Sequence, residues 1–451
     1  MSTAVESPLP AIPGLAPGAE HQVPSLPEVH ATVGLSRSPQ YWRRLLGFLG
    51  PGFLISVGYM DPGNWATDIA GGSQFGYTLL SVIMISNLMA ILLQSLSLKL
   101  GVATERDLAQ LCRESYGRWV SFGLWVGAEI AIAACDLAEV IGSAIALNLL
   151  FHIPLFYGVL ITGLDVLLIL LLQRWGFRVV EALVITLIGT IIAMFGVQLF
   201  LSRPEYGPVL RNLFIPSASI VTNPTMLYIA IGMLGATVMP HNLYLHSSIV
   251  QSRRYKRTPE GKREAIFMAN IDSAMALTVA LFVNAAIVVV AAAVFYRSGH
   301  YEVAAIEDAY KLLSPLVGAA GASTLFAIAL LASGQNSSIT GTLAGQVVME
   351  GFIHIRLQPW MRRMITRTIA IIPTIIVVAF TGERGTEKLL LLSQVILSLQ
   401  LSFAVIPLVI FTGSRKRMGE FVNGPWLQGL AWFVAALIAG LNAWFLVLMV
   451  R

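Results

Sequence analysis

The sequence is poor in charged residues. Only 12% of its 451 residues are Asp, Glu, Lys or Arg, whereas 56% are hydrophobic and the mean hydropathy is +0.75. A soluble domain carries about 25% charged residues, so this chain has too few solvated groups to keep a protein of its size in water. We therefore predict an all-α integral membrane protein whose main solvent is the lipid bilayer.

Cysteine is nearly absent, with two residues in the whole chain. This scarcity excludes a disulfide framework and a cysteine-rich metal site. The sequence also lacks a phosphate-binding loop or any other nucleotide motif. Its formal net charge of +5 would suit nucleic acid, but the positions of the basic residues point to another explanation.

The first 40 residues differ from the rest. They contain seven prolines among Ser, Ala and Gly, with no apolar periodicity. Such a composition buries too little surface to order itself, and it lacks the basic start and apolar stretch of a signal peptide. We predict that residues 1–40 form a disordered cytoplasmic tail and that residues 41–451 form one transmembrane domain.

The remainder contains about eleven stretches long enough to cross a bilayer, which takes roughly 20 apolar residues. They lie near 45–74, 76–98, 119–150, 154–173, 179–201, 225–252, 268–296, 319–353, 368–381, 389–413 and 426–450. With a cytoplasmic N-terminus, alternation places about three-quarters of the 29 Lys and Arg residues inside, as the positive-inside rule requires. The basic charge is thus explained without nucleic acid.

Two of these spans are interrupted near their middle, the first by Asp61–Asn64 and the sixth by Met239–Asn242. Both interruptions contain proline, which removes a backbone donor, and irregular backbone at membrane depth occurs where it lines a cavity. Either one alone could be a simple kink. The pair, five spans apart, is typical of an inverted repeat with a binding site at the midplane. We predict a 5+5 arrangement, with repeats at about 45–201 and 225–413 and an extra helix at about 426–450.

The interruptions offer a set of metal ligands. Asp61 supplies a carboxylate, Asn64 an amide oxygen and Met239 a thioether, while Gly58 and Ala236 supply carbonyls freed just before each break. A carboxylate in mid-membrane costs a few kcal/mol and usually has a functional partner. Oxygen ligands alone would suit Mg²⁺ or Ca²⁺, whereas a thioether favours transition metals. The alternative for Met239 is that it only fills the core.

A second polar set lies on the third span, where Glu129, Asp136 and Glu139 share one helical face. Arg362 and Arg363, at the inner start of the ninth span, are candidate counter-ions. The set could be a proton relay or a structural ion-pair network.

Two histidines, His241 and His246, lie on the sixth span and could titrate near neutral pH. We include them among the candidates for a proton pathway.

At these residues the sequence resembles the Nramp family of metal transporters, in its bacterial proton-coupled manganese branch. Both family signatures are present, Asp-Pro-Gly-Asn at Asp61–Asn64 and Met-Pro-His at Met239–His241, with Gly50–Gly52 and Leu245–Ser247 matching around them. The resemblance runs from about residue 45 to the C-terminus. It implies a LeuT-like fold in the plasma (inner) membrane and uptake of Mn²⁺, Fe²⁺ and related ions, such as Cd²⁺ and Co²⁺, with protons. The metal would be the substrate, and no cofactor is expected.

The resemblance also implies roles for single residues. The ion ligands would be the side chains of Asp61, Asn64 and Met239, the carbonyls of Ala236 and Gly58, and Gln394 when the outer side closes. Magnesium-transporting relatives lack the methionine. The proton route would use Asp136 and Glu139 and would be extended inward by Glu129, Arg362 and Arg363.

Two other functions are alternatives to metal transport. A LeuT-type, sodium-coupled symporter of amino acids or other organic substrates would also use broken helices, but Asp61 would repel a substrate carboxylate. A membrane-embedded metalloenzyme would need an open metal site, typically with His or Cys ligands, and the sequence has no histidine pair at zinc spacing inside the membrane. We therefore predict a transporter rather than an enzyme.

Overall fold

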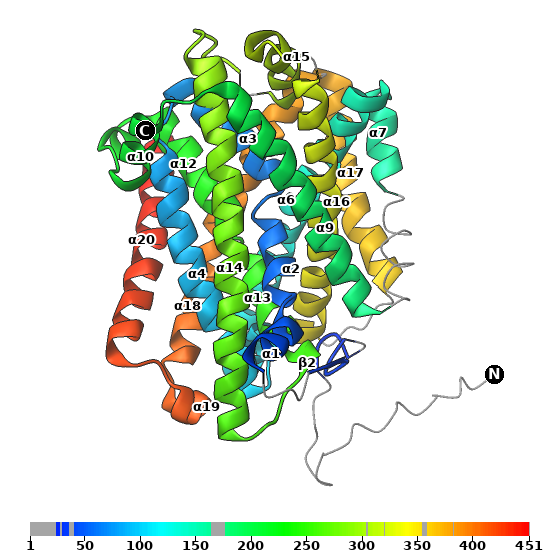
Figure 1. The fold of residues 1–451 in the computed structure, drawn as a ribbon. Coiled ribbons are helices and arrows are strands. Elements are labelled where there is room, and N and C mark those ends of the chain that lie inside the picture. The colour runs from blue at the N-terminus through cyan, green and yellow to red at the C-terminus, as the bar shows by residue number, and fades with distance from the viewer. Residues whose placement is uncertain are drawn as a thin grey trace, which may run out of the picture.

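The computed structural model describes residues 24–27, 29–35, 40–163, 176–303, 305–319, 321–353, 359–381 and 383–450. These residues form a bundle of long helices running roughly parallel to one another (Figure 1). Within them, the only strands are β1 (Val33–Gly34) and β2 (Arg253–Arg254), which pair in parallel. The prediction of an all-α architecture is confirmed.

The helices follow one another along the chain, and each of the two predicted breaks separates two of them. In order, the helices are α1 (Tyr41–Phe48), α2 (Pro51–Gly58), α3 (Pro62–Phe75), α4 (Leu80–Thr104), α5 (Leu108–Ser115), α6 (Arg118–Phe151), α7 (Leu155–Thr162), α9 (Phe177–Ser202), α10 (Tyr206–Phe214), α11 (Ser219–Thr222), α12 (Pro224–Thr237), α13 (Pro240–Ile249), α14 (Pro259–Ala291), α15 (Ile306–Val317), α16 (Ala322–Ile353), α17 (Pro359–Thr381), α18 (Glu383–Thr412), α19 (Arg415–Met418) and α20 (Pro425–Val450).

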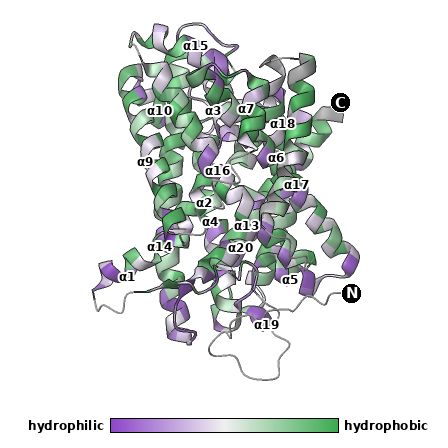
Figure 2. Ribbon diagram, turned by 90° about the vertical axis from the view of Figure 1, so that its right-hand side faces the viewer, coloured by the Kyte–Doolittle hydropathy of each residue, from purple (hydrophilic) through white to green (hydrophobic). Residues whose placement is uncertain are grey.

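Most of the predicted spans correspond to single long elements. Within the described residues, seven segments are long and apolar enough to cross a membrane. The first predicted span is divided between α2 and α3, and the fourth begins with α7 and continues outside the described residues. The eighth is α16, whose 32 residues include a polar stretch at 333–338, and the ninth lies within α17. Most residues along the length of the bundle are hydrophobic. Hydrophilic residues gather at the end that carries α1 and α19 (Figure 2).

Both predicted helix breaks are present. The first helix stops at Gly58 and resumes at Pro62, and the sixth stops at Thr237 and resumes at Pro240. Asp61 has an extended backbone and caps α3, because its carboxylate accepts the Asn64 backbone N–H at 2.8 Å. In both breaks a proline begins the following helix, a position where its missing N–H costs nothing. The halves pack in pairs, with α3 against α12 and α2 against α13.

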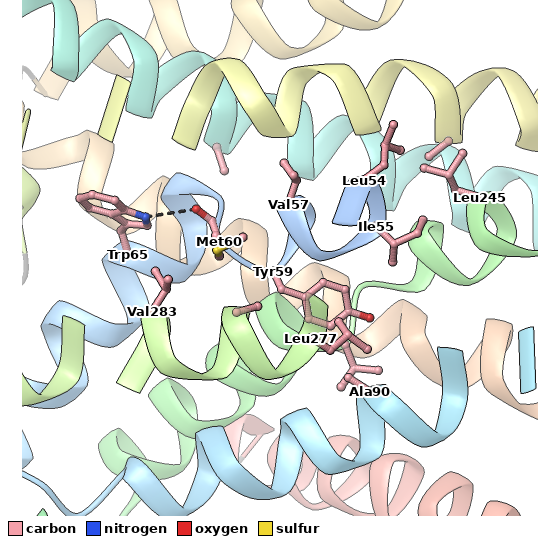
Figure 3. Packing of buried hydrophobic residues seen from close by; sticks show 14 of the residues in the cluster. Leu54, Ile55, Val57, Tyr59, Met60, Trp65, Ala90, Leu245, Leu277 and Val283 are labelled. Carbon is pink, nitrogen blue, oxygen red and sulfur yellow. Dashed lines mark hydrogen bonds between the residues drawn. The ribbon is translucent and has the colours of Figure 1, made fainter. Parts of the chain in front are cut away.

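Apolar packing fixes the first break. The Trp65 indole donates to the Met60 carbonyl at 3.2 Å, a bond drawn in Figure 3 beside the apolar side chains of α2. The same indole meets the rings of Phe195 and Phe326 edge-on, with centroids 4.8 and 5.2 Å away. Trp65 is fully buried, so the second half of the broken helix, α3, is held by α9 and α16.

Buried charges hold the start of α2. The Asp272 carboxylate on α14 accepts the Gly52 backbone N–H at 2.6 Å, and a Cβ on Gly52 would lie 2.6 Å from the Ser273 nitrogen. Arg253 pairs with Glu181 at 2.7 Å, and both side chains are buried. The close approach of α14 requires glycine at position 52, one of the positions that match the family around the first signature.

Part of the predicted disordered tail is ordered. Residues 24–27 and 29–35 lie against the end of the bundle formed by α13 and α16, and Val33 pairs with Arg253. Leu26, Val29 and Val33 are buried, with 2, 8 and 6% of their surfaces exposed. The expectation of disorder is therefore wrong for this segment. The average composition of residues 1–40 is dominated by Pro, Ser and Gly, and it does not reveal three spaced apolar residues. Residues 1–23 lie outside the described residues.

Candidate metal site

The Asn64 side chain lies at the meeting point of the two breaks. Its Nδ2 donates to Asp61 Oδ1 at 2.7 Å and to the Ala236 carbonyl at 3.0 Å, and it lies 3.5 Å from the Gly58 carbonyl. Four of the six predicted ligands thus converge on one point, although they come from segments more than 170 residues apart. The cap at Asp61 and the early end of α12 cause this convergence.

The fifth predicted ligand, Met239, is fully buried in the second break. A Cβ on Gly58 would lie 3.2 Å from Met239 Sδ and 2.3 Å from Asn242 Nδ2, so the sulfur faces the first break across the site. The Asn242 amide in turn lies 3.8 Å from the sulfur. Three residues of α6 and α18 pack around the methionine: Ala131, Cys135 and Leu397.

The sixth predicted ligand, Gln394, comes from α18. Its amide lies directly against the first turn of α3, since a Cβ on Gly63 would be only 1.9 Å from Nε2. A Cβ on Gly235 would be 2.2 Å from the Gln394 carbonyl. Gln394 is therefore in contact with both broken helices, and its own side chain is fully buried.

Several oxygens of this cluster have no hydrogen-bond partner among the described residues. They are Asp61 Oδ2, Asn242 Oδ1 and Gln394 Oε1, all of them buried. A buried carboxylate oxygen without a partner is costly, and within the described residues Asp61 makes no ion pair. A cation would satisfy it. Because Asn64 now presents its NH₂ group to Asp61, coordination by Asn64 requires the amide to turn over and present its oxygen.

The acidic face of α6 lies beside the first break. Asp136 and Glu139 are buried, and Glu129 is half-buried. A Cβ on Gly142 would lie 2.1 Å from the Pro62 Cβ, so α6 packs on the first turn of α3. Glu139 precedes Gly142 by about one helical turn on α6.

The two histidines occupy different surroundings. Both ring nitrogens of His241 are buried and have no hydrogen-bond partner among the described residues. His246 Nδ1 lies 2.9 Å from Gln94 Oε1, and Gln94 Nε2 donates to the Tyr59 hydroxyl at 2.8 Å. A hydrogen-bonded chain therefore joins His246 to the first break. Two further predicted members of the proton route have side chains outside the described part of the structure, Arg362 and Arg363.

Asn284 on α14 also contacts the first break, although it is not among the predicted site residues. Its Nδ2 donates to the Tyr59 carbonyl at 2.8 Å and lies 3.4 Å from Asn64 Oδ1, so it supports both the unwound backbone and the central amide. Asp68, a buried carboxylate two turns into α3, is likewise absent from the prediction. In the sequence, each of these two residues is marked only as a polar residue within an apolar span. That pattern does not reveal the direction in which the side chain points.

Comparisons with known proteins agree with this architecture. The family model described as natural resistance-associated macrophage protein-like, Nramp, matches residues 52–448. A "Divalent metal cation transporter MntH" from a Nostoc species is 62% identical over 423 residues, which cover 94% of this chain and 96% of that relative. A protein of the same name from Listeria innocua is 60% identical over 423 residues, 94% of each chain.

Solved structures give the same result. The Eremococcus coleocola manganese transporter superposes with a TM-score of 0.87 at 45% identity, covering 93% of this chain and 90% of that one. A nucleobase-cation-symport-1 family transporter superposes with a TM-score of 0.59 at 16% identity, and the match covers 88% of this chain and 91% of that one. The two proteins share the LeuT-like fold. The sequence match over most of the chain, together with the two broken helices, establishes that this protein belongs to the Nramp family.

Proposed function

We propose that this protein imports divalent transition metal ions, Mn²⁺ first and also Fe²⁺, Cd²⁺ and Co²⁺, in symport with protons. The observation that carries the proposal is the meeting of Asp61, Asn64 and Met239 around one buried point between the two breaks. The names of the relatives, divalent metal cation transporter and manganese transporter, support the substrate class.

In this proposal the ion lies between the two breaks. Asp61 supplies the negative charge, Asn64 an amide oxygen and Met239 the sulfur, while Gly58 and Ala236 add backbone carbonyls. Gln394 closes the site from α18. Hard oxygens combined with one soft thioether favour transition metals over Mg²⁺ and Ca²⁺.

Protons would travel along the acidic face of α6. Asp136 and Glu139 are buried on α6, which packs on the first turn of α3 at Gly142, and carboxylates at membrane depth are the usual elements of proton relays. Glu129 lies two turns before Asp136 and would extend the route toward the cytoplasm with Arg362 and Arg363. His241 and His246 would serve the same pathway. The basic loops support an orientation with the N-terminus in the cytoplasm, and we place the protein in the plasma (inner) membrane.

The alternatives gain no support. A sodium-coupled symporter of amino acids would have to accept a substrate carboxylate beside Asp61. The relatives are named as metal transporters, which are not enzymes.

The test is uptake by purified protein in proteoliposomes that contain a metal-sensitive dye and a pH-sensitive dye. We expect saturable Mn²⁺ entry accompanied by internal acidification. A folded, correctly inserted protein that moves no Mn²⁺ would refute the proposed substrate. Mn²⁺ entry without acidification would refute only the coupling to protons.

A further inference from the structure

The ordered part of the N-terminal segment crosses the ends of several helices. The Leu26 backbone N–H donates to Glu350 Oε2, near the end of α16, at 3.1 Å. The Ser248 hydroxyl, near the end of α13, donates to the Ser25 carbonyl at 3.4 Å. We call residues 25–27 and 29–34 the cytoplasmic strap, because the basic loops place this end of the bundle inside the cell.

The second half of the strap joins the segment that follows α13. The Ala31 N–H donates to the Gln251 carbonyl at 3.0 Å, and the Arg254 guanidinium returns bonds of 3.2 and 3.1 Å to the Ala31 carbonyl. Val33 then pairs with Arg253 in the parallel β1–β2 ladder. The strap is therefore attached along its length by backbone hydrogen bonds and not only by its apolar side chains.

Through Arg253 the strap also reaches the first broken helix. The Arg253 guanidinium donates to the Leu49 carbonyl, just before α2, at 2.7 Å and pairs with Glu181 of α9. Burial lowers the pKa of Arg253 below its ordinary value, yet Glu181 remains a direct partner. One segment thus links the inner halves of both broken helices, α2 and α13, to α16 and α9.

These inner halves lie between the proposed ion position and the cytoplasm. An exit to that side would separate α2 or α13 from the helices packed beside them. Moving α13 away from α16 breaks the strap contacts, and moving α2 breaks the bond between Leu49 and Arg253, the residue that pairs with the strap. The burial of Leu26, Val29 and Val33 means that detachment also exposes apolar surface to water.

We propose that the cytoplasmic strap is an autoinhibitory contact that holds the inner exit closed and must detach before the transporter opens to the cytoplasm. The purpose of this contact rests on the transport function proposed above, but the test of the contact requires no transport.

The test follows the accessibility of a cysteine beside the strap. Ile249, the last residue of α13, is 1% exposed and directly follows Ser248, whose hydroxyl donates to the Ser25 carbonyl of the strap. We would place Ile249→Cys in a background where the two native cysteines, Cys112 and Cys135, are alanine. In inside-out vesicles without metal, a membrane-impermeant maleimide then reports how often the inner side opens.

Two matched pairs of variants separate the strap from general damage. Leu26→Asp places a charge at a buried strap position, whereas Thr32→Asp adds the same charge at an exposed strap position. Ala31→Pro removes the N–H that bonds Gln251 and cannot adopt the observed φ of 52°, whereas Ala31→Gly keeps the N–H and suits that angle.

We expect Leu26→Asp and Ala31→Pro to label at least tenfold faster than the parent, and Thr32→Asp and Ala31→Gly to stay within twofold of it. Ala31→Pro changes only the segment outside the membrane, so it remains informative if Leu26→Asp folds poorly. Equal labelling of Ala31→Pro and Ala31→Gly overturns the proposal. Failure of Mn²⁺ uptake in the proteoliposome assay would refute the proposed function and leave this result standing.

Discussion

Truncating Met239 to alanine separates a ligand from a packing residue. The side chain is fully buried among Ala131, Cys135 and Leu397, so its loss leaves a cavity and should cost about 2–5 kcal/mol of stability in either case. The carboxylate of Asp61, the amide of Asn64 and the backbone carbonyls all remain, so an ion can still bind. Only the soft ligand is removed.

The expected change is therefore one of selectivity. Water would fill the vacated position and make the site all-oxygen, which suits Ca²⁺ and Mg²⁺. We expect Mn²⁺ uptake within about threefold of the parent, Cd²⁺ uptake reduced at least about tenfold, corresponding to about 1.4 kcal/mol, and measurable competition by Ca²⁺ or Mg²⁺. The assay is initial uptake in proteoliposomes with each ion, normalised to the amount of folded protein.

Met233→Ala is the matched control. Met233 is equally buried, lies on the same broken helix and packs in a different cluster, away from the break. It should lose similar stability with no change in the ratio between ions. Met233→Ala should lower the uptake of all metals by one factor. If Met239→Ala does the same, the sulfur is not a ligand and the selectivity prediction is refuted.

Three further predictions concern carboxylates. Asp61→Ala should abolish metal uptake, because a dication would then face only neutral dipoles, and normal Mn²⁺ transport by this variant would eliminate the proposed site. Asp136→Asn and Glu139→Gln should reduce metal-driven acidification more than metal movement, and normal acidification in both would make the acidic face structural. Burial raises the pKa of Asp107, which caps α5 outside the membrane spans, from 3.8 to about 6. The folded protein therefore holds this proton more tightly than the unfolded chain, and up to about 3 kcal/mol of stability is lost as the pH rises from 4 through 6. Thermal unfolding of Asp107→Asn should lack that component, and an unchanged pH profile would contradict it.

The two helix breaks could be predicted from the sequence because their signals are local. Proline beside Asp61 and beside Met239 stops a helix wherever it occurs in an apolar span, and an odd spacing of five spans indicates the repeat. The convergence of Gly58 and Ala236 on one point follows from that symmetry. Gln394, by contrast, was identified only through the family resemblance, since no pattern in α18 marks it.

Other features depend on tertiary contacts that no local pattern reports. The amide of Asn284 stands alone in an apolar span, and its direction is fixed only by how α14 packs against α2 and α3. The strap was missed for a different reason. Leu26, Val29 and Val33 are too few to change the composition of a proline-rich tail, yet they suffice once α13 and α16 provide a surface to cover.

The central position of the Asn64 amide has a kinetic consequence. A carrier that takes up substrate must return empty on every cycle, whereas one that only exchanges ions need not. The Asn64 NH₂ group takes the place of a small cation, holding Asp61 Oδ1 and the Ala236 carbonyl at hydrogen-bonding distance. In this orientation the amide satisfies both acceptors by itself, so a carrier could return empty without leaving them unsatisfied. Every release and rebinding of an ion would turn this amide over, so the rate of that turn would enter net uptake and exchange alike.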